Sequence, residues 1–162
     1  MALRAAQRVD RLVLADTACR YPASAADLWQ ERIRQVRAEG LESQLEGTLA
    51  RWFTAPFRAA NPGVMERIAT LIRATPPHGY AGCGKAIATL DVLARLAEVS
   101  CPTLVIVGAE DGSTPPAMAR EIAQAIPGAR LEIIANAAHL ANIEQAGVFN
   151  RLLLEFLSEP VS

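Results

Sequence analysis

Asp111 and His139 are the two residues of this 162-residue sequence whose types and positions suit acid–base chemistry. Each follows a short apolar run, at 103–108 and at 131–134 respectively. A carboxylate that accepts a hydrogen bond from an imidazole N–H fixes the tautomer of the ring and stabilises the cation that forms when the ring takes up a proton. Taken singly, such an aspartate is more often a turn former and such a histidine a packing residue. Their matching positions after successive apolar runs favour the catalytic interpretation for the pair.

The elements that must position this pair are predicted from the apolar pattern. The runs at 11–16, 103–108 and 131–134 are typical of strands that are buried on both faces of a parallel sheet. The chain from about 25 to 95 has helical spacing of its apolar residues, and its final helix is expected at about 84–96. A later helix is expected to begin with Thr114 as its N-cap. Strands that alternate with helices predict an α/β architecture, in which catalytic groups lie beyond the carboxyl ends of parallel strands.

Composition and charge exclude several classes of protein. The sequence is 51% hydrophobic and 20% charged, as in ordinary globular domains, and 16 Lys and Arg against 17 Asp and Glu leave a net charge of −1. Without a basic face the chain is not expected to bind nucleic acid, and no apolar run approaches the ~18 residues of a membrane span. The charged N-terminus is unlike a secretory signal. Cys19, Cys83 and Cys101 are too widely spaced for a disulfide framework or a zinc site, so we expect a cytoplasmic protein without a metal site.

Residues 101–157 resemble the C-terminal end of the α/β-hydrolase fold, in which the triad acid follows one strand and the triad histidine follows the last strand. The motifs G-x-x-D at 108–111 and A-H-L-x-N at 138–142 are shared by many α/β-hydrolases and indicate the superfamily. A closer resemblance, which covers nearly the whole chain, is to the 3-oxoadipate enol-lactonases. It depends on two further segments, Arg-Trp-Phe-Thr at 51–54 and Thr-Pro-Pro-His-Gly-Tyr-Ala-Gly-Cys at 75–83.

The resemblance implies a serine hydrolase, with no cofactor, that opens a lactone ring in the catabolism of aromatic compounds. It implies that Asp111 is the triad acid and that His139 is the general base. The lactone substrate of that family carries a free carboxylate, so Arg51 and Trp52 are candidate substrate-binding residues. Trp52 also continues an apolar stripe that is typical of the buried side of a helix.

The same resemblance divides the chain into three segments. Residues 1–22 would be the tail of a helix and the first remaining strand of the hydrolase core, residues 23–98 a helical cap over the active site, and residues 99–162 the C-terminal core with the acid and the histidine. The sequence departs from the family because it has no G-x-S-x-G nucleophile elbow, and the first strands and the oxyanion loop are absent too. We therefore expect a partial α/β-hydrolase fold, with about three parallel strands and a helical cap, that is inactive alone.

Two alternatives stay open from the sequence. The predicted strand at Leu12–Ala15 lacks the neighbour that would bear the nucleophile, so its edge is expected to be open to self-association or to a partner chain. A non-catalytic protein or a split half, which completes its sheet with another chain, is therefore the first alternative. The second is an α/β-hydrolase that acts on another small-molecule ester or lactone.

Overall fold

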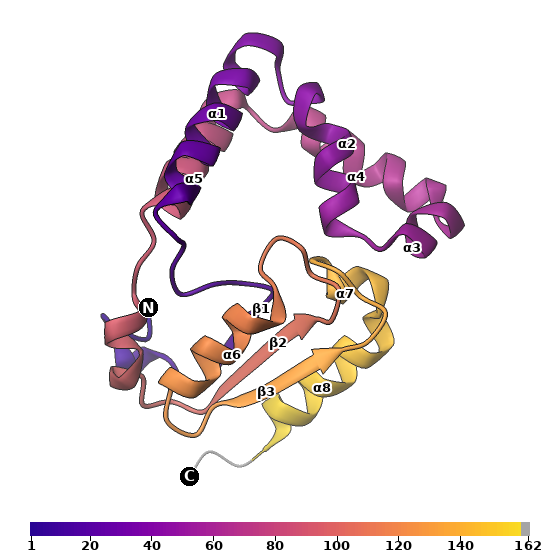
Figure 1. Cartoon of the computed structure of the whole chain (residues 1–162). Helices are drawn as coiled ribbons and strands as arrows, with labels where there is room; N and C mark the ends of the chain where they lie inside the picture. The colour runs from indigo at the N-terminus through magenta and orange to yellow at the C-terminus, as the bar shows by residue number, and fades with distance from the viewer. Residues whose placement is uncertain (160–162) are drawn as a thin grey trace. The chain divides into compact units, whose positions relative to one another are not determined.

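The computed structural model describes residues 1–159, so residues 160–162 of the predicted segment 99–162 lie outside the described part. The chain divides into two compact units (Figure 1). The first, here called the core unit, consists of Met1–Cys19 and Val92–Ser162, and the second, the helical unit, consists of Arg20–Asp91. Each unit has its own packing and is described by itself.

The core unit is built on a parallel sheet with the strand order β1 (Leu12–Ala15), β2 (Thr103–Gly108) and β3 (Arg130–Ile134). Leu12 lies opposite Thr103 in the β1–β2 pair, and Gly108 lies opposite Ile134 in the β2–β3 pair. The expectation of three parallel strands is confirmed. Because β2 lies between β1 and β3, the carboxyl ends of neighbouring strands meet at one edge of the sheet.

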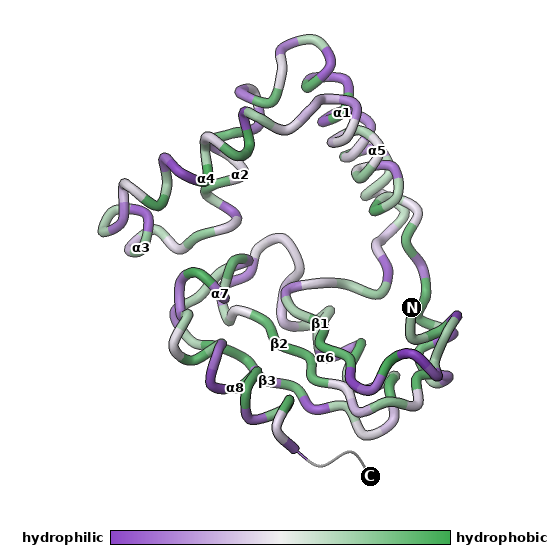
Figure 2. The backbone as a smooth tube through the Cα atoms, turned by 180° about the vertical axis from the view of Figure 1, so that it is seen from behind, coloured by the Kyte–Doolittle hydropathy of each residue, from purple (hydrophilic) through white to green (hydrophobic). Residues whose placement is uncertain are grey.

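Helices cover both faces of this sheet (Figure 1). Val105 and Val107 face α6 (Pro116–Ala125) and the 3-10 helix η2 (Leu93–Glu98). Leu104 and Ile106 face the other side, where they pack with α7 (Ala141–Glu144) and with Phe156 of α8 (Ala146–Ser158). Successive strand residues point to opposite faces, so a strand covered on both sides must be apolar throughout. Figure 2 shows the middle of β2 as hydrophobic, and all residues of the strand are buried.

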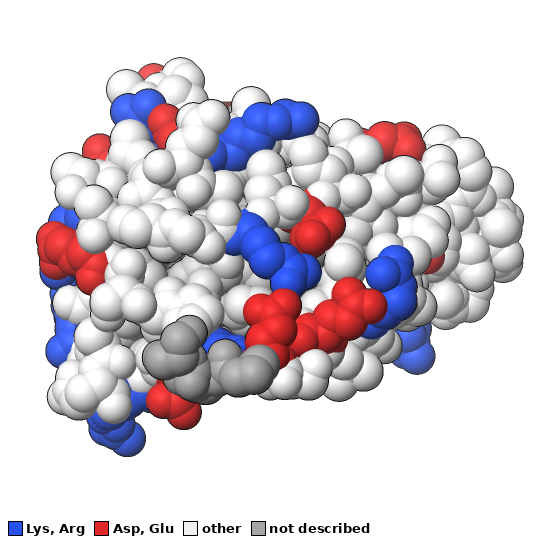
Figure 3. All heavy atoms as spheres, turned by 90° about the horizontal axis from the view of Figure 1, so that it is seen from below, with Lys and Arg blue, Asp and Glu red and all other residues white. Residues whose placement is uncertain are grey.

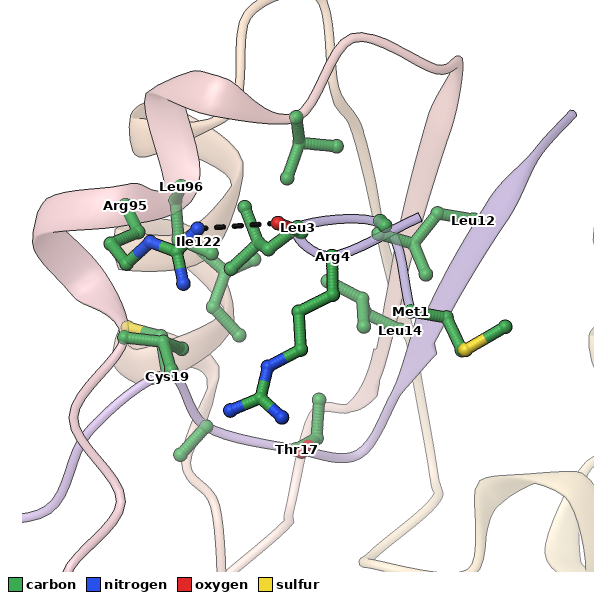
Figure 4. A pocket seen from close by; sticks show the side chains of 14 residues that line it. Met1, Leu3, Arg4, Leu12, Leu14, Thr17, Cys19, Arg95, Leu96 and Ile122 are labelled. Atoms are coloured by element: carbon green, nitrogen blue, oxygen red, sulfur yellow. Dashed lines mark hydrogen bonds between the residues drawn. The ribbon is translucent and has the colours of Figure 1, made fainter. Parts of the chain in front are cut away.

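The edge strand β1 differs from the expectation that it is buried on both faces. Leu12 and Leu14 are half-buried and Ala15 is exposed, since in the described part of the chain only β2 pairs with this strand. Leu12 and Leu14 line a pocket of about 330 Å³ together with N-terminal residues and with η2 (Figure 4). Next to it a hydrogen bond from Arg95 Nη2 to the Leu3 carbonyl, 3.2 Å long, ties η2 to the N-terminal segment that contains the short helix η1 (Ala6–Arg8).

The helical unit consists of α1 (Ser24–Glu39), α2 (Glu42–Trp52), α3 (Ala55–Ala60), α4 (Pro62–Ala74) and α5 (Pro77–Ala88). Helix α1 packs along α5, and α2 packs against α1 and α4. Prolines begin α4 and α5, where the missing N–H costs no helical hydrogen bond. An isolated antiparallel bridge between Arg20 and Asp91 joins the two ends of the unit.

The prediction of one helix at about 84–96 is wrong. Helix α5 ends at Ala88, and the following apolar residues form the separate 3-10 helix η2. Leu96 and Val99 pack into the core unit, against Val105 and Ile122, because their side chains cover one face of the sheet. The two compact units meet at residues 19–20 and 91–92, and the sequence analysis places its segment boundaries at 22–23 and 98–99.

In the described part of the chain no helix is both long and apolar enough to cross a membrane. On the face seen in Figure 3, basic and acidic side chains lie next to one another. This mixture is the surface that the near-zero net charge of −1 predicts.

Candidate active site

Two loops at the carboxyl ends of β2 and β3 form the candidate site in the core unit. The Ala109 N–H donates to the Ile134 carbonyl at 2.8 Å, and the Glu110 N–H donates to the Ala137 carbonyl at 2.9 Å. These bonds hold the loop after β2 against the loop after β3. The two loops therefore have a fixed relative position before any side chain is considered.

Gly108 ends β2 where the backbone of the next loop lies almost in contact. A Cβ atom at this position would lie 2.2 Å from the Ala138 carbonyl oxygen and 2.5 Å from that of Ala137. Both obstacles are backbone atoms, which cannot turn away as a side chain can. Only glycine allows this close approach, and the approach brings Asp111 and His139 to the same side of the sheet.

Asp111 and His139, the two predicted site residues of the core unit, are brought together by the structure. The distance from Asp111 Oδ2 to His139 Nδ1 is 2.9 Å, and the Asp111 side chain is 0% exposed against 22% for His139. Asp111 Oδ1 accepts hydrogen bonds from the backbone N–H groups of Ser113, at 2.7 Å, and of Thr114, at 2.9 Å. Asp111 is thus both a turn former and the hydrogen-bond partner of the imidazole.

The electrostatics of the pair determine which nitrogen carries the proton. Burial alone would raise the pKa of Asp111, but hydrogen bonds from His139 and Thr114 outweigh it and hold that pKa below its ordinary value. An ionised carboxylate only accepts hydrogen bonds, so the proton between the residues belongs to His139 Nδ1. The lone pair of the neutral ring then lies on Nε2, which is the arrangement of a general base.

Thr114 is a site residue that the sequence analysis misassigned. Helix α6 begins at Pro116 with Pro115 as its N-cap, so Thr114 is not the cap. Its buried hydroxyl instead donates to Asp111 Oδ2 at 2.7 Å and lies 3.3 Å from His139 Nδ1. A hydroxyl residue three positions after a candidate acid, in D-x-x-T, is the signal that could have identified it, since a turn of this length returns the side chain to the carboxylate.

Asp16 is a further polar residue of this edge that the sequence analysis does not assign to the site, although it is the last residue of the predicted strand run at 11–16. It comes directly after β1, with a left-handed backbone (φ 44°) that aspartate tolerates better than most residues. Its Oδ1 accepts a hydrogen bond from the Gly108 N–H at 2.9 Å. Burial raises the pKa of Asp16 to about 6; the charge of Asp111 adds to this, while the Gly108 bond and the charge of His139 act against it. A second carboxylate therefore lies at this edge of the sheet.

Glu144 of α7 fixes the backbone next to the histidine. Its buried Oε2 accepts a hydrogen bond from the Ala138 N–H at 2.5 Å. This bond holds the loop between β3 and α7 one residue before His139. The orientation of the imidazole thus depends on a contact that no sequence pattern pointed to.

Arg51 and Trp52, the other predicted site residues, are in the helical unit at the end of α2. Both are half-buried, and Arg51 Nη2 donates to Thr48 Oγ1, one turn earlier, at 3.3 Å. In the described residues no three His, Cys, Asp or Glu side chains gather in a way that could hold a metal ion.

Comparison with known proteins adds to this geometry. Residues 1–146 match the family described as alpha/beta hydrolase fold. The chain is 33% identical over 150 residues to 3-oxoadipate enol-lactonase 2 of Acinetobacter baylyi, a match that covers 93% of this chain and 55% of that protein. The chain spans about half the length of the curated relatives it matches.

Two solved structures are similar over nearly the whole chain. The enol-lactonase from Burkholderia xenovorans LB400 has a TM-score of 0.93 and 36% identity, and the match covers 98% of this chain and 60% of that one. A hydrolase from Pseudomonas aeruginosa PA01 has a TM-score of 0.91 and 39% identity, with coverage of 98% and 59%. The three strands and the helices around them therefore correspond to part of a larger fold.

Proposed function

This chain belongs to the alpha/beta hydrolase fold family, and we propose that it carries the acid and the base of a serine hydrolase that opens an enol lactone. The observation that carries the proposal is the Asp111–His139 pair, bonded at 2.9 Å beyond the ends of two neighbouring parallel strands. Identity of about one third to proteins named 3-oxoadipate enol-lactonase supports the substrate class. In this proposal the reaction belongs to the catabolism of aromatic compounds.

The proposed roles of the two residues follow from their protonation. His139 Nε2 takes the proton of a serine hydroxyl while the serine oxygen attacks the lactone carbonyl carbon. The ring C–O bond then breaks, and the imidazolium returns the proton to the leaving ring oxygen. Water hydrolyses the acyl-enzyme by the same route, which releases a carboxylic acid and restores the serine. Asp111 keeps the proton on Nδ1 and stabilises the imidazolium in both steps.

The nucleophile in this proposal comes from polypeptide outside these 162 residues. The sequence has no G-x-S-x-G, and Ser113 belongs to the acid's own loop, where its N–H is bonded to Asp111. Without a nucleophile and an oxyanion hole, there is no nucleophilic attack on a carbonyl carbon for Asp111 and His139 to assist. We therefore propose that the 162-residue chain alone does not hydrolyse lactones.

A lactone-hydrolysis assay tests this proposal. A polypeptide extended by the in-frame codons upstream of Met1, if these encode G-x-S-x-G, is expected to be active, and His139→Ala is expected to lower its kcat/KM by at least about 10³-fold. His78→Ala, which replaces the other histidine on the exposed start of α5, is the matched control and is expected to leave kcat/KM within about two-fold.

Three results would contradict the proposal. If the 162-residue chain alone hydrolyses the lactone and His139→Ala abolishes this turnover, the proposed inactivity of the chain is wrong. Equal activity of the extended protein with and without His139 would overturn the role of the pair. Preference of the extended protein for unrelated esters over enol lactones would replace the substrate and keep the mechanism, since the two triad motifs are common to many α/β-hydrolases.

A second candidate function rests on the edge of β1. The Leu12 N–H donates to the Pro102 carbonyl just before β2, and the Asp16 N–H donates to the Ile106 carbonyl of β2, so the intervening Val13 and Ala15 direct their backbone groups to the open edge. We propose that this edge completes its sheet with another chain, either a second copy or a partner. Size-exclusion chromatography of the 162-residue chain is expected to give an associated species, and Ala15→Lys, a charge at the exposed edge position, is expected to shift it toward the monomer. A monomer at all concentrations would contradict this function.

A further inference from the structure

Asp16 carries a carboxyl group at the carboxyl edge of the sheet that the mechanism above does not use. Its backbone N–H donates to the Ile106 carbonyl at 2.8 Å, which continues the β1–β2 pairing by one residue. In a parallel ladder, the carbonyl of Asp16 would next accept from the Gly108 N–H. The Asp16 side chain makes that bond instead, since Oδ1 accepts from the Gly108 N–H at 2.9 Å. The side chain thus takes the place of a backbone carbonyl at the end of the ladder.

The contribution of Asp16 to stability does not explain this arrangement. Among the described residues, the two non-glycine residues with a positive φ are Asp16, at 44°, and Asn136, at 54°, and both follow strands at this edge. A left-handed backbone is unfavourable for a residue with a Cβ atom. Burial also raises the pKa of Asp16 to about 6, so folding disfavours its charged form. Residues that cost stability in this way gather at functional sites.

Gly108, the partner of Asp16, contacts the loops of both the acid and the histidine. Its carbonyl accepts a hydrogen bond from the Asp111 N–H at 3.2 Å. Its Cα lies against Ala138, the residue before His139, because a Cβ at Gly108 would be 2.2 Å from the Ala138 carbonyl oxygen. A shift of Gly108 would therefore move Asp111 and His139 relative to each other.

A second link joins Asp16 to the loop of the histidine. A backbone hydrogen bond from Ala141, two residues after His139, acts against burial and lowers the pKa of Asp16. Ala141 is fully buried and begins α7, where an N–H group has no partner within the helix. A carboxylate accepts several hydrogen bonds, so one side chain can hold backbone groups of both loops.

We propose that Asp16 is a positioning residue for the acid and the histidine. Through Gly108 it holds the two loops so that His139 Nδ1 faces Asp111 Oδ2. The accepting oxygen performs this role, so an amide oxygen at the same place would preserve it. The importance of Asp16 for hydrolysis rests on the proposed function, whereas the positioning itself rests on the hydrogen bonds of the core unit.

Nuclear magnetic resonance of the 162-residue chain, labelled with 15N-histidine at about pH 8, tests this role. The nitrogen shifts show which ring nitrogen of His139 carries the proton, and His78, the other histidine, is an exposed internal reference. Asp16→Gly removes the acceptor and permits the left-handed backbone. It is expected to lower the ratio of the Nδ1–H to the Nε2–H tautomer of His139 about ten-fold, as the loss of one well-placed hydrogen bond would.

Two matched variants isolate the accepting oxygen. Asp16→Asn keeps an oxygen at the same place, and its tautomer ratio is expected to stay within about two-fold of wild type. Asp10→Gly makes the same substitution at an exposed aspartate just before the other end of β1, and it is also expected to stay within about two-fold. Hydrogen exchange of the buried β2 amides, measured on the same samples, reports the stability of the sheet.

Every other result overturns the role of Asp16. An unchanged ratio in Asp16→Gly would do so, as would an equal fall in Asp10→Gly or in Asp16→Asn. An unfolded Asp16→Gly chain, or β2 amides that lose protection by the same factor, would make Asp16 a structural residue. A wild-type ring without a proton on Nδ1 would instead contradict the proposed base. No measurement uses turnover, so failure of the positioning role and failure of the proposed hydrolase are separate results.

Discussion

The core unit and the helical unit hold their candidate functional groups in different ways. In the core unit, Asp111 accepts hydrogen bonds from two backbone N–H groups, from the Thr114 hydroxyl and from His139, all within 2.7–2.9 Å. In the helical unit, Arg51 has one side-chain bond of 3.3 Å, to Thr48. Proton transfer needs reacting atoms in fixed positions, and the bonds on Asp111 supply this. The comparison indicates that the ends of the strands hold their polar side chains more firmly than the helix faces do.

The largest expected effect comes from Gly108→Ala in the core unit. The new Cβ would meet two backbone carbonyl oxygens, at 2.2 and 2.5 Å, so the loop after β3 must move. We expect the free energy of unfolding to fall by about 3 kcal/mol or more, which is the upper range for overpacking. Urea unfolding followed by far-UV circular dichroism measures this loss.

Gly112→Ala is the matched control for Gly108. It lies in the same loop, and a Cβ there would have no atom within 4 Å. We expect a change of less than about 0.5 kcal/mol. If both substitutions cost the same, the close approach of the two loops is not what fixes the acid and the histidine.

Thr114→Val is expected to have the second largest effect. Valine keeps the shape but removes the hydroxyl that donates to Asp111 Oδ2 at 2.7 Å in a buried site. We expect a loss of about 1–2 kcal/mol, since the carboxylate loses one of its donors without gaining water. Thr114→Ser keeps the donor and is expected to cost less than valine does in the same urea titration. The reverse order would mean that packing, not the hydroxyl, makes Thr114 important.

The sequence predicted the parts of this design that depend on local pattern. Buried strands read as continuous apolar runs, and parallel strands bring their ends together, so Asp111 and His139 could be placed side by side. The role of Asp16 could not be predicted, because its bond to Gly108 depends on the register between β1 and β2, which are far apart in the chain. The boundary between α5 and η2 could not be predicted for a similar reason. Both elements have apolar residues at helical spacing, and only tertiary packing assigns Leu96 to the sheet.

Asp16→Asn tests the contribution of the carboxylate at the end of β1 to stability. The pKa of Asp16 in the folded protein is about 6, above its ordinary value of 3.8, so the folded state binds this proton more tightly than the unfolded state does. Ionised Asp16 therefore costs stability, and this cost develops as the pH rises from about 4 through 6. Because the residue is partly exposed, we expect Asp16→Asn to stabilise the protein by only about 1 kcal/mol at pH 8.

The difference between Asp16→Asn and wild type is expected to be smallest at about pH 3, below the ordinary pKa of 3.8, where Asp16 is mostly neutral in both states. Asparagine keeps an oxygen for the Gly108 N–H and tolerates the left-handed backbone, so the comparison isolates the charge. Urea midpoints measured from about pH 3 to about pH 8 provide the test. A constant difference across this range would mean that the substitution acts through packing and not through the titration of Asp16.

The smallest expected effect is that of Gly84→Ala in the helical unit. A Cβ at Gly84 would lie 2.7 Å from Trp29 Cε3, but this obstacle belongs to a side chain, which can shift, and not to the backbone. The gain in helix propensity offsets part of the clash, so we expect a net loss of about 0.5 kcal/mol. Gly82→Ala on the same helix meets no atom within 4 Å and is expected to stabilise by about the same amount. Both tryptophans belong to the helical unit, so their fluorescence reports its unfolding. If Gly84→Ala costs as much as Gly108→Ala, the helix faces are as rigid as the strand ends, and the contrast between the two units fails.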